Sequence, residues 1–321
     1  MVSLENSERM QDNFSRIQGE IENHLGTMVS KERLPSKQND VLHIDTVKGK
    51  FVVKIYEQRL AKASPNREIQ MSRMLSNLSQ IRELVYADES AQLIPYHYAV
   101  YRYVEGDTLR TLLETKDLSS EQVEDIVKQI HSLISDITEI RTQGFGRIEE
   151  GVLKGGSLSW VEFLKESQKP TIDTFRSADL IPETLYLSVL RILDKHEDRF
   201  QLASPRLLPM DLNVSNLVLD VNAKIKLIDL KTFWSGDPLC AKAQFYSLTN
   251  GTIVGEAYRN ILNLNSEDEF KFRFYALSDN LNVLAYIARS EPNTVMSATP
   301  WANRHKFIDL IKQNVEFLGS T

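Results

Sequence analysis

The sequence is poor in the features that mark secreted or membrane-spanning proteins. Cys240 is the only cysteine in 321 residues, which excludes an internal disulfide framework and suits a reducing compartment. No apolar run approaches the length of about 18 residues that a membrane helix needs, and the polar N-terminus lacks the apolar core of a signal peptide. We therefore expect a cytoplasmic protein without a membrane partner.

Positive charge is also scarce. The chain has 38 lysines and arginines against 44 acids, a net charge of −6. A nucleic-acid partner requires a basic surface, so none is expected, whereas a cationic small molecule would suit this balance. With 42% hydrophobic and 26% charged residues, the composition is that of a globular protein with one large domain or two lobes.

The first hundred residues combine strands with two helices. Apolar residues repeat at helical spacing from Met10 to Leu25, and Gly26 ends the pattern. A second, short helix is predicted over 67–78. Runs rich in β-branched and aromatic residues predict the strands, over 26–34, 40–47, 50–57, 84–89 and 96–104. This pattern predicts a mostly antiparallel sheet with one inserted helix.

From Glu105 onward the pattern becomes helical. Helices are predicted over 121–141, 158–168, 183–197, 268–288 and 302–317. The only strand-like segments expected in this half are 216–220 and 224–230. The sequence thus predicts an α+β fold with two lobes, a β-rich lobe over 1–104 and a mainly helical lobe over 105–321.

Polar residues interrupt two apolar runs of the second half. Asp211 and Asn216 lie five apart before one strand, and Asp229 ends the next strand. A hairpin between these strands would bring the three side chains to one end. Carboxylate and amide oxygens are ligands that suit Mg²⁺. One acid that accepts a hydroxyl proton, with an asparagine and a later acid on Mg²⁺, is the arrangement of kinase-type phosphoryl transfer.

The first half contains the other residues that this interpretation requires. Lys54 lies in an apolar strand and needs a partner, because an unpaired buried charge is costly. Glu68, in the following helix, has the spacing of the glutamate that pairs with the phosphate-binding lysine of kinases. The loop 36–40, which contains Asn39, would cover the phosphates although it has no glycine.

The strand that ends before Gly106 is the candidate edge for an adenine ring. The Arg102 carbonyl and the Val104 amide are the expected backbone contacts. Tyr101 and Tyr103 fit two interpretations, ordinary strand aromatics or the wall of the adenine pocket.

Six segments in this order resemble the aminoglycoside phosphotransferase and choline kinase group, the small-molecule relatives of the protein kinases. They are FVVK, REIQMSRML, YRYVEGDTL, QGFGRI with SLSWVEFL, MDLNVSNLVLD, and LIDLKTFWSGDP. The resemblance implies a bilobal protein-kinase-like fold and transfer from ATP, or GTP, to a hydroxyl of a small molecule.

The resemblance also implies a role for each matching residue. Asp211 is implied as the catalytic base, Asn216 and Asp229 as Mg²⁺ ligands, and Lys54 with Glu68 as the phosphate-binding pair. Asp237 would be structural, satisfying backbone donors near the catalytic loop.

Three positions depart from the family pattern. Pro209-Met210 replaces the His-Gly that precedes the base, Lys231 stands where many relatives have a second acid, and Ala241 where an aspartate is common. Because Pro209-Met210 cannot supply the histidine of this pair, other residues must hold Asp211. Lys231 would weaken a second Mg²⁺ site or bring positive charge near the phosphates.

Each residue also has a simpler interpretation. Asp211 and Asn216 are typical of helix caps and Asx turns. Lys54 fits a lysine extending from an edge strand, and Glu68 a solvated acid in a first helical turn. The acids of 267–269 fit either attraction of a cationic acceptor or an ordinary solvated face.

The acceptor is not specified by the sequence. An antibiotic of the aminoglycoside, macrolide or amicoumacin type is favoured, and the resulting activity would be resistance or self-protection. The alternatives are a kinase for a metabolite such as choline, homoserine or a sugar, and a pseudokinase that binds nucleotide without turnover. A protein kinase is disfavoured because no A-P-E segment follows Asp229.

Overall fold

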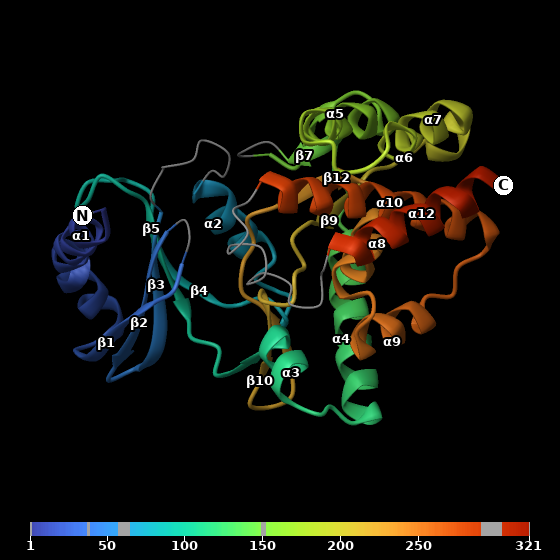
Figure 1. Ribbon diagram of the computed structural model, residues 1–321. Coiled ribbons are helices and arrows are strands. Elements are labelled where there is room, and N and C mark those ends of the chain that lie inside the picture. Colours follow the sequence, from blue (N-terminus) through green and yellow to red (C-terminus); the bar gives the residue numbers. More distant parts are fainter. Residues whose placement is uncertain (1, 37–38, 57–64, 149–151, 290–303, 321) are drawn as a thin grey trace. The chain divides into compact units, whose positions relative to one another are not determined.

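The computed structural model describes residues 2–36, 39–56, 65–148, 152–289 and 304–320. The chain forms two compact units (Figure 1): Met1–Gly106 with Lys226–Lys231, and Asp107–Ile225 with Thr232–Thr321. The segment 226–231 therefore belongs with the first hundred residues. Because this segment carries Asp229, one candidate site residue lies in the first unit, although the sequence assigned it to the lobe over 105–321.

The first unit is built on a five-stranded sheet with two helices. In sheet order the strands are β1 (Met28–Leu34), β2 (Asp40–Thr46), β3 (Gly49–Ile55), β5 (Tyr98–Arg102) and β4 (Leu84–Asp88). Every neighbouring pair is antiparallel. The helices are α1 (Val2–Leu25) and α2 (Pro65–Met74). The β-rich first region predicted from the sequence is confirmed.

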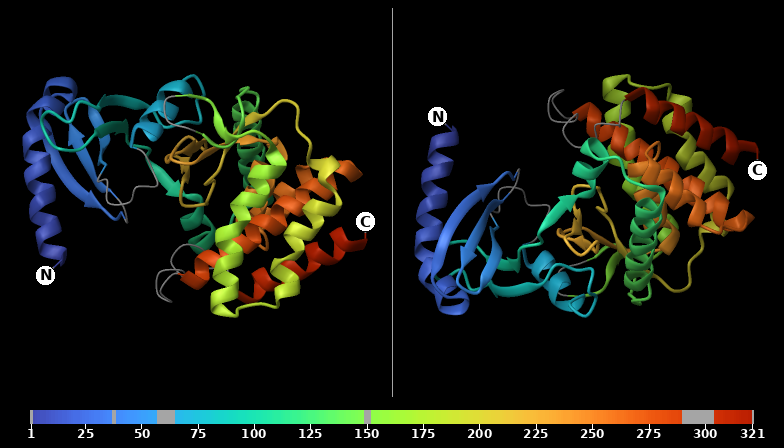
Figure 2. Two further views of the ribbon diagram at one scale, coloured as in Figure 1. Left: turned by 90° about the horizontal axis from the view of Figure 1, so that it is seen from above. Right: turned by 90° about the horizontal axis from the view of Figure 1, so that it is seen from below.

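The two faces of this sheet have different partners. Helix α1 runs beside the strands (Figure 2) and buries four apolar residues against β2, β3 and β5: Phe14, Ile17, Ile21 and Leu25. Side chains alternate along a strand, so Val53 and Ile55 of β3 face this cluster. Lys54 therefore faces the other side, where Tyr56 packs with Ile69 of α2. The alternation of β3 thus turns the lysine toward α2.

The chain has two further small sheets. One is four-stranded, in the order β8 (Gly155–Ser157), β7 (Phe145–Ile148), β12 (Phe233–Gly236) and β9 (Arg206–Pro209). The other has the order β11 (Ile225–Leu227), β10 (Leu217–Asp220) and β6 (Gly106–Thr108), and it includes the residues at which the chain passes between the units.

Helices form the rest of the second unit. They are α3 (Leu109–Thr115), α4 (Ser120–Thr138), α5 (Trp160–Ala178), α6 (Glu183–Tyr186), α7 (Ser188–Lys195), the 3-10 helix η1 (Glu197–Phe200), α8 (Pro238–Thr249), α9 (Ile253–Ile261), α10 (Ser266–Arg289) and α12 (Arg304–Ser320). Helix α10 packs against α5, α8 and α12, and α4 packs against α9 (Figure 2). The mainly helical second region is therefore confirmed.

Several predictions for the second half were wrong in detail. The four-stranded sheet was missed because strands of three or four residues are too short to show an alternating pattern. Helix α8 was missed because it buries residues on most of its sides and shows no single apolar stripe. Helix α5 continues past Pro170, whereas the predicted helix stopped at residue 168. The predicted helix over 183–197 is divided into α6, α7 and η1.

Helices that span a bilayer are long and almost free of charge. Within the described ranges, no helix combines the length and the apolar character that crossing a membrane requires.

Candidate functional site

The first unit holds a buried ion pair between Lys54 and Glu68. The Lys54 Nζ atom lies 2.8 Å from Oε1 and 2.6 Å from Oε2 of Glu68. The exposed fractions of the two side chains are 7% and 1%. Strand β3 directs the lysine toward α2, and the first turn of α2 carries the glutamate. The structure thus brings together two residues that the sequence linked only by their spacing.

Three more charged residues extend this pair into a cluster. Asp229 Oδ2 lies 3.7 Å from Lys54 Nζ and 2.7 Å from Lys231 Nζ. Arg82 Nη2 lies 3.8 Å from Glu68 Oε1. We call these five residues the charged cluster. Arg82 was not among the predicted site residues, because nothing in the sequence around it distinguishes it from a surface arginine.

Backbone pairing fixes the segment that carries Asp229. The amide of Leu227 donates to the Gln80 carbonyl at 2.8 Å, and the amide of Arg82 donates to the Leu227 carbonyl at 3.1 Å. Lys226 Nζ also donates to the Ser79 carbonyl. Residues 79–82 therefore anchor both Arg82 and the strand that leads to Asp229.

The charged cluster determines the protonation of its members. Burial lowers the pKa of Lys54, and the carboxylates of Glu68 and Asp229 oppose this effect. Burial raises the pKa of Asp229, but Lys54, Lys231 and Arg82 outweigh burial and leave this pKa below its ordinary value. Asp229 is therefore ionised at neutral pH.

The second unit carries Asp211 on a loop after β9. Asp211 is exposed and has a φ of +126°, a region that residues other than glycine rarely adopt. Such a conformation costs about 1–3 kcal/mol and persists only where its surroundings hold it. The Met210 amide donates to the Thr232 carbonyl at 2.9 Å, and the Asp211 amide donates to Gln244 Oε1 at 2.9 Å. These bonds hold the chain on both sides of the Met210–Asp211 peptide.

Two asparagines complete the loop. Asn213 Nδ2 donates to Asp211 Oδ1 at 2.7 Å, and Asn213 Oδ1 accepts from the Ser215 amide at 2.9 Å. Asn216 Nδ2 donates to the Asp211 carbonyl at 3.0 Å. Asn213 was not among the predicted site residues, yet it holds the carboxylate of Asp211 and supplies the side-chain bond of the turn. We call residues 210–216 the amide-held loop.

The two predicted metal ligands lie in different units, and each has an oxygen suited to a cation. Asp229 Oδ1 is buried and, among the described residues, has no hydrogen-bond partner. Asn216 uses its Nδ2 as a donor, which leaves Oδ1 as the amide atom suited to a cation. No cluster of three or more His, Cys, Asp or Glu side chains in the described ranges is arranged for a metal. Mg²⁺ often binds through one or two protein ligands with water and phosphates, so each of these oxygens suits it.

All four residues of the predicted adenine edge, 101–104, lie within the described ranges. Tyr101 is buried, and its hydroxyl lies 2.9 Å from that of Tyr56. The Tyr103 amide donates to the Lys50 carbonyl at 3.1 Å, and its ring centroid lies 4.4 Å from that of His43. Tyr101 therefore packs in the interior of the first unit, whereas Tyr103 is only partly buried.

The remaining nucleotide candidates lie nearer the surface. The Arg102 guanidinium covers the Phe51 ring, and its Nε lies 3.2 Å from Glu83 Oε2. Val104 follows β5 without regular secondary structure. The Asn39 amide donates to Ser36 Oγ at 3.3 Å, and residues 37–38 of the same loop lie outside the described residues.

Asp237 is structural, but the backbone donor that it satisfies is not the one expected. It caps α8 by accepting from the Leu239 amide at 3.0 Å, and its Oδ2 accepts from the Tyr275 hydroxyl at 2.9 Å. Burial raises its pKa. The backbone donor that Asp237 satisfies thus belongs to α8, and the described acceptor for the Asp211 amide is Gln244.

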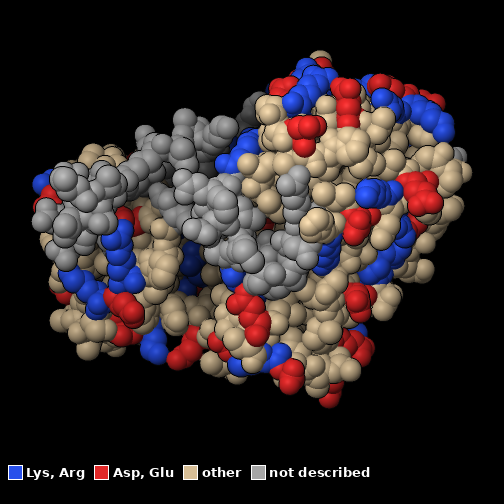
Figure 3. Space-filling model, viewed as in Figure 1, with Lys and Arg blue, Asp and Glu red and all other residues tan. Residues whose placement is uncertain are grey.

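Two of the three acids of 267–269 are paired with bases. Glu269 contacts Arg259 and Arg273, and Glu267 lies 3.7 Å from Arg199. On the face shown in Figure 3, acidic and basic side chains are interspersed over the second unit. This pairing favours the solvated-face interpretation of the run.

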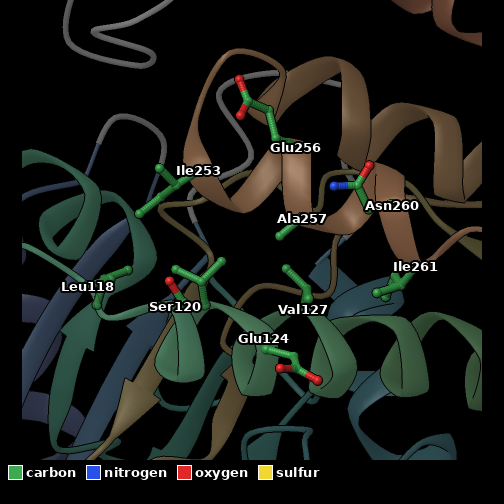
Figure 4. A pocket seen from close by; sticks show the side chains of 10 residues that line it. Leu118, Ser120, Glu124, Val127, Ile253, Glu256, Ala257, Asn260 and Ile261 are labelled. Atoms are coloured by element: carbon green, nitrogen blue, oxygen red, sulfur yellow. The ribbon is translucent and has the colours of Figure 1, made fainter.

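A cavity of about 440 Å³ lies between α4 and α9 of the second unit (Figure 4). Val127, Ile253 and Ala257 point into it, whereas Glu124 and Glu256 extend from the outer sides of the helices. None of the predicted site residues lines this cavity.

A sequence model of the phosphotransferase enzyme family matches residues 32–265, which is most of the chain. The chain belongs to this family. No curated protein matches the sequence. The family assignment therefore rests on the conserved pattern of the family and not on one close relative.

Solved structures of similar fold agree with the family. A thermostable mutant of aminoglycoside phosphotransferase APH(4)-Ia, in ternary complex with AMP-PNP and hygromycin B, has 17% identity and a TM-score of 0.68 over 92% of this chain and 98% of its own. A putative fructosamine-3-kinase from Haemophilus somnus 129PT has 17% identity and a TM-score of 0.60, over 93% and 96%. The streptomycin–ATP complex of APH(2")-IIa has 15% identity and a TM-score of 0.57, over 95% of both chains. These similarities show the protein-kinase-like fold, and with the family they identify a small-molecule phosphotransferase.

Proposed function

We propose that the protein transfers the γ-phosphoryl group of ATP to a hydroxyl group of a small molecule, in a reaction that requires Mg²⁺. The observation that carries this proposal is the position of Lys54, whose Nζ is held between the carboxylates of Glu68 and Asp229. Both carboxylates favour the charged form of the lysine against the effect of burial and fix its Nζ atom. A fixed cation of this kind suits the α- and β-phosphates of a nucleotide.

The first unit would bind the nucleotide. Lys54 contacts the phosphates, Glu68 orients Lys54, and the backbone of Arg102 and Val104 receives the adenine beside Tyr101 and Tyr103. Asn39, in the loop between β1 and β2, would cover the phosphates. GTP remains a second donor to test, because backbone contacts do not define the base.

The second unit would supply the base. The Asp211 carboxylate accepts the proton of the attacking hydroxyl, the new bond forms between that oxygen and the γ-phosphorus, and the bond from phosphorus to the leaving oxygen of ADP breaks. Asn213 Nδ2 orients the carboxylate at 2.7 Å. Since positioning carries much of the rate in such reactions, the bonds that hold this loop contribute directly to it.

Asn216 and Asp229 would hold the Mg²⁺. Bound there, the ion neutralises the negative charge of the phosphates. Asp229 suits this role because it is ionised and its Oδ1 has no partner among the described residues. Lys231 contacts the other oxygen of the same carboxylate, at 2.7 Å, and brings a second positive charge to this place.

For the acceptor we favour a hydroxylated antibiotic of the aminoglycoside, macrolide or amicoumacin type. Similar folds carry hygromycin B and streptomycin in the complexes named above, which supports this class. The similarity to a putative fructosamine-3-kinase favours the second candidate, a kinase for a sugar-like or other small metabolite.

The test is Mg²⁺-dependent phosphate transfer from ATP, and separately from GTP, to a panel of hydroxylated antibiotics and common metabolites. Asp211→Ala is the inactive variant, and Asp117→Ala, an exposed aspartate of the same unit, is its matched control. We expect transfer to one antibiotic at micromolar concentration, abolished only by Asp211→Ala. Transfer that saturates only with a millimolar metabolite would support the second candidate. Nucleotide binding without transfer to any acceptor would contradict the proposal and indicate a pseudokinase.

A further inference from the structure

The conformation of Asp211 requires an external support. Its φ of +126° is unfavourable for a residue with a side chain, and its amide hydrogen is directed to Gln244 Oε1 on α8 at 2.9 Å. Gln244 is 33 residues away in sequence. Loss of this acceptor would leave the amide without its partner at the residue that carries the proposed base.

Gln244 is itself oriented by Asp279 of α10. The Gln244 side chain lies beside the Asp279 carboxyl group and lowers its pKa, as a hydrogen-bond donor does. Because Gln244 Oε1 accepts from the Asp211 amide, its Nε2 is the end that donates to Asp279. An aspartate oxygen accepts this bond whether the carboxyl group is charged or neutral. Asp279 therefore selects the orientation of the amide that turns Oε1 toward the catalytic loop.

The carboxyl group of Asp279 has little other support. Its Oδ2 is buried and, in the described part of the chain, has no hydrogen-bond partner. Burial raises the pKa of Asp279 to about 7, and the bond from Gln244 opposes this effect. A buried acid of this kind destabilises the fold at neutral pH. Its retention beside Gln244 therefore calls for a role other than stability.

Helix α8 includes one of the positions at which the chain departs from the family pattern. Residue 241, where the family commonly has an aspartate, is Ala241 here and has no polar side-chain atom. Gln244 lies three residues further on, on the same face of the helix. In this chain the contact between α8 and the Asp211 amide is made by Gln244.

We propose that Gln244 and Asp279 are positioning residues that hold the backbone of Asp211 in its catalytic conformation, by a relay from α10 through α8 to the loop. This inference rests on the proposed function, since it assigns a purpose to the geometry of the proposed base. The relay acts through the Asp211 amide, and its residues are not members of the charged cluster. It therefore affects the rate of transfer and leaves nucleotide affinity unchanged.

Three variants separate this role from a general contribution to packing. Gln244→Met keeps the volume of the side chain and removes both hydrogen bonds. Asp279→Asn keeps an oxygen that accepts from Gln244 Nε2 and is the conservative variant. Gln168→Met is the matched control, because Gln168 is a buried glutamine whose Nε2 donates to Ser278 Oγ of the same helix α10 at 2.6 Å.

The first readout requires no acceptor. Hydrogen–deuterium exchange of the peptide that covers residues 207–217 reports directly on the Asp211 amide. We expect faster exchange in Gln244→Met, by about tenfold or more at that amide, and wild-type exchange in Gln168→Met and Asp279→Asn. Unchanged exchange in a folded Gln244→Met would overturn the proposal.

The second readout is kinetic. With the acceptor found in the panel, we expect Gln244→Met to lower kcat about tenfold or more and to leave the Kd for Mg·ATP within twofold of wild type. A wild-type kcat, or an equal fall in Gln168→Met, would also overturn the proposal. If the wild type transfers phosphate to no acceptor, the proposed function fails, and the exchange measurement still decides whether the relay holds the loop.

Discussion

The charged cluster of the first unit and the amide-held loop of the second are stabilised by different forces. Lys54 and Glu68 are almost fully buried and pair by charge, with side-chain exposures of 7% and 1%. Asp211 is exposed, and the contacts described for its loop come from the neutral amides of Asn213, Asn216 and Gln244 and from the backbone. Removing one charge from the cluster leaves the remaining buried charges with fewer partners, whereas removing one amide mainly changes geometry.

This difference predicts two kinds of variant. Variants of the charged cluster should alter stability and the binding of nucleotide and metal, because the cluster balances burial against charge. Variants of the amide-held loop should alter the rate of transfer, because a small displacement of a reacting group is costly in rate. The four predictions below test this contrast, in order of decreasing effect.

Glu68→Gln should have the largest effect on stability. It leaves Lys54 buried with only Asp229 nearby, and breaking a buried ion pair typically costs about 3–5 kcal/mol of unfolding free energy. Urea denaturation measures the loss. Glu83→Gln is the matched control, since Glu83 is 59% exposed in its pair with Arg102 and should cost less than about 1 kcal/mol. An equal loss of unfolding free energy in Glu68→Gln and Glu83→Gln would show that the buried pair contributes no more than the exposed one.

Asp279→Asn should change how stability depends on pH. The pKa of Asp279 is raised to about 7 in the folded protein, so between about pH 4 and pH 7 the unfolded chain releases a proton that the folded protein retains. Stability from this group is therefore full below pH 4 and is lost as pH rises through 7. At about 1.4 kcal/mol per pH unit of pKa difference, the loss is on the order of 4 kcal/mol.

Asparagine does not titrate, so Asp279→Asn should be more stable than wild type at pH 8 and not at pH 4.5. Thermal unfolding at both pH values measures the difference. A constant difference between the two proteins at both pH values would show that Asp279 does not titrate in this range.

Asn213→Ala should lower the rate of transfer about tenfold. It removes the bond to Asp211 Oδ1, and one hydrogen bond to a charged group contributes about 1.5–3 kcal/mol, part of which the exposed carboxylate regains from water. The Kd for nucleotide should not change. Asn222→Ala, an exposed asparagine in the turn after β10, is the control. An increased Kd with an unchanged kcat would place Asn213 in nucleotide binding instead.

Lys231→Met should have the smallest effect, on the Mg²⁺ requirement. The lysine competes with a metal for the Asp229 carboxylate, so its removal should lower the Mg²⁺ concentration for half-maximal nucleotide binding, by about threefold for a partly exposed pair. Asp229 stays ionised because Lys54 and Arg82 remain. Lys226→Met, in the same segment, should leave this concentration unchanged. A higher Mg²⁺ requirement in Lys231→Met would mean that the lysine assists the phosphates instead.

Local patterns predicted most of the fold. The apolar repeat of α1, the β-branched residues of β2 and β3, and the apolar stripe of α4 are visible in the sequence because each is a pattern of residues a few positions apart. The short strands β7, β8, β9 and β12 were invisible because they are stabilised by pairing with distant partners, not by their own pattern.

The candidate site divides in the same way. Lys54, Glu68, Asp211, Asn216 and Asp229 were found because their types and order follow a known chemistry. The residues that hold them were not found. Gln244 and Asp279 act over 33 and 68 positions from Asp211, and nothing in the local sequence links them.

We propose that the first unit binds the nucleotide and that Asp211 performs the chemistry. The most direct test is to measure the Kd for Mg·ATP and the transfer rate of Asp211→Asn together, beside the wild type. We predict an unchanged Kd and a rate at least about 10²-fold lower, since the variant keeps the shape of the side chain and loses its proton acceptor. A rate near that of wild type would show that Asp211 is not the base, and a lost affinity would show that the two functions are not divided between the units.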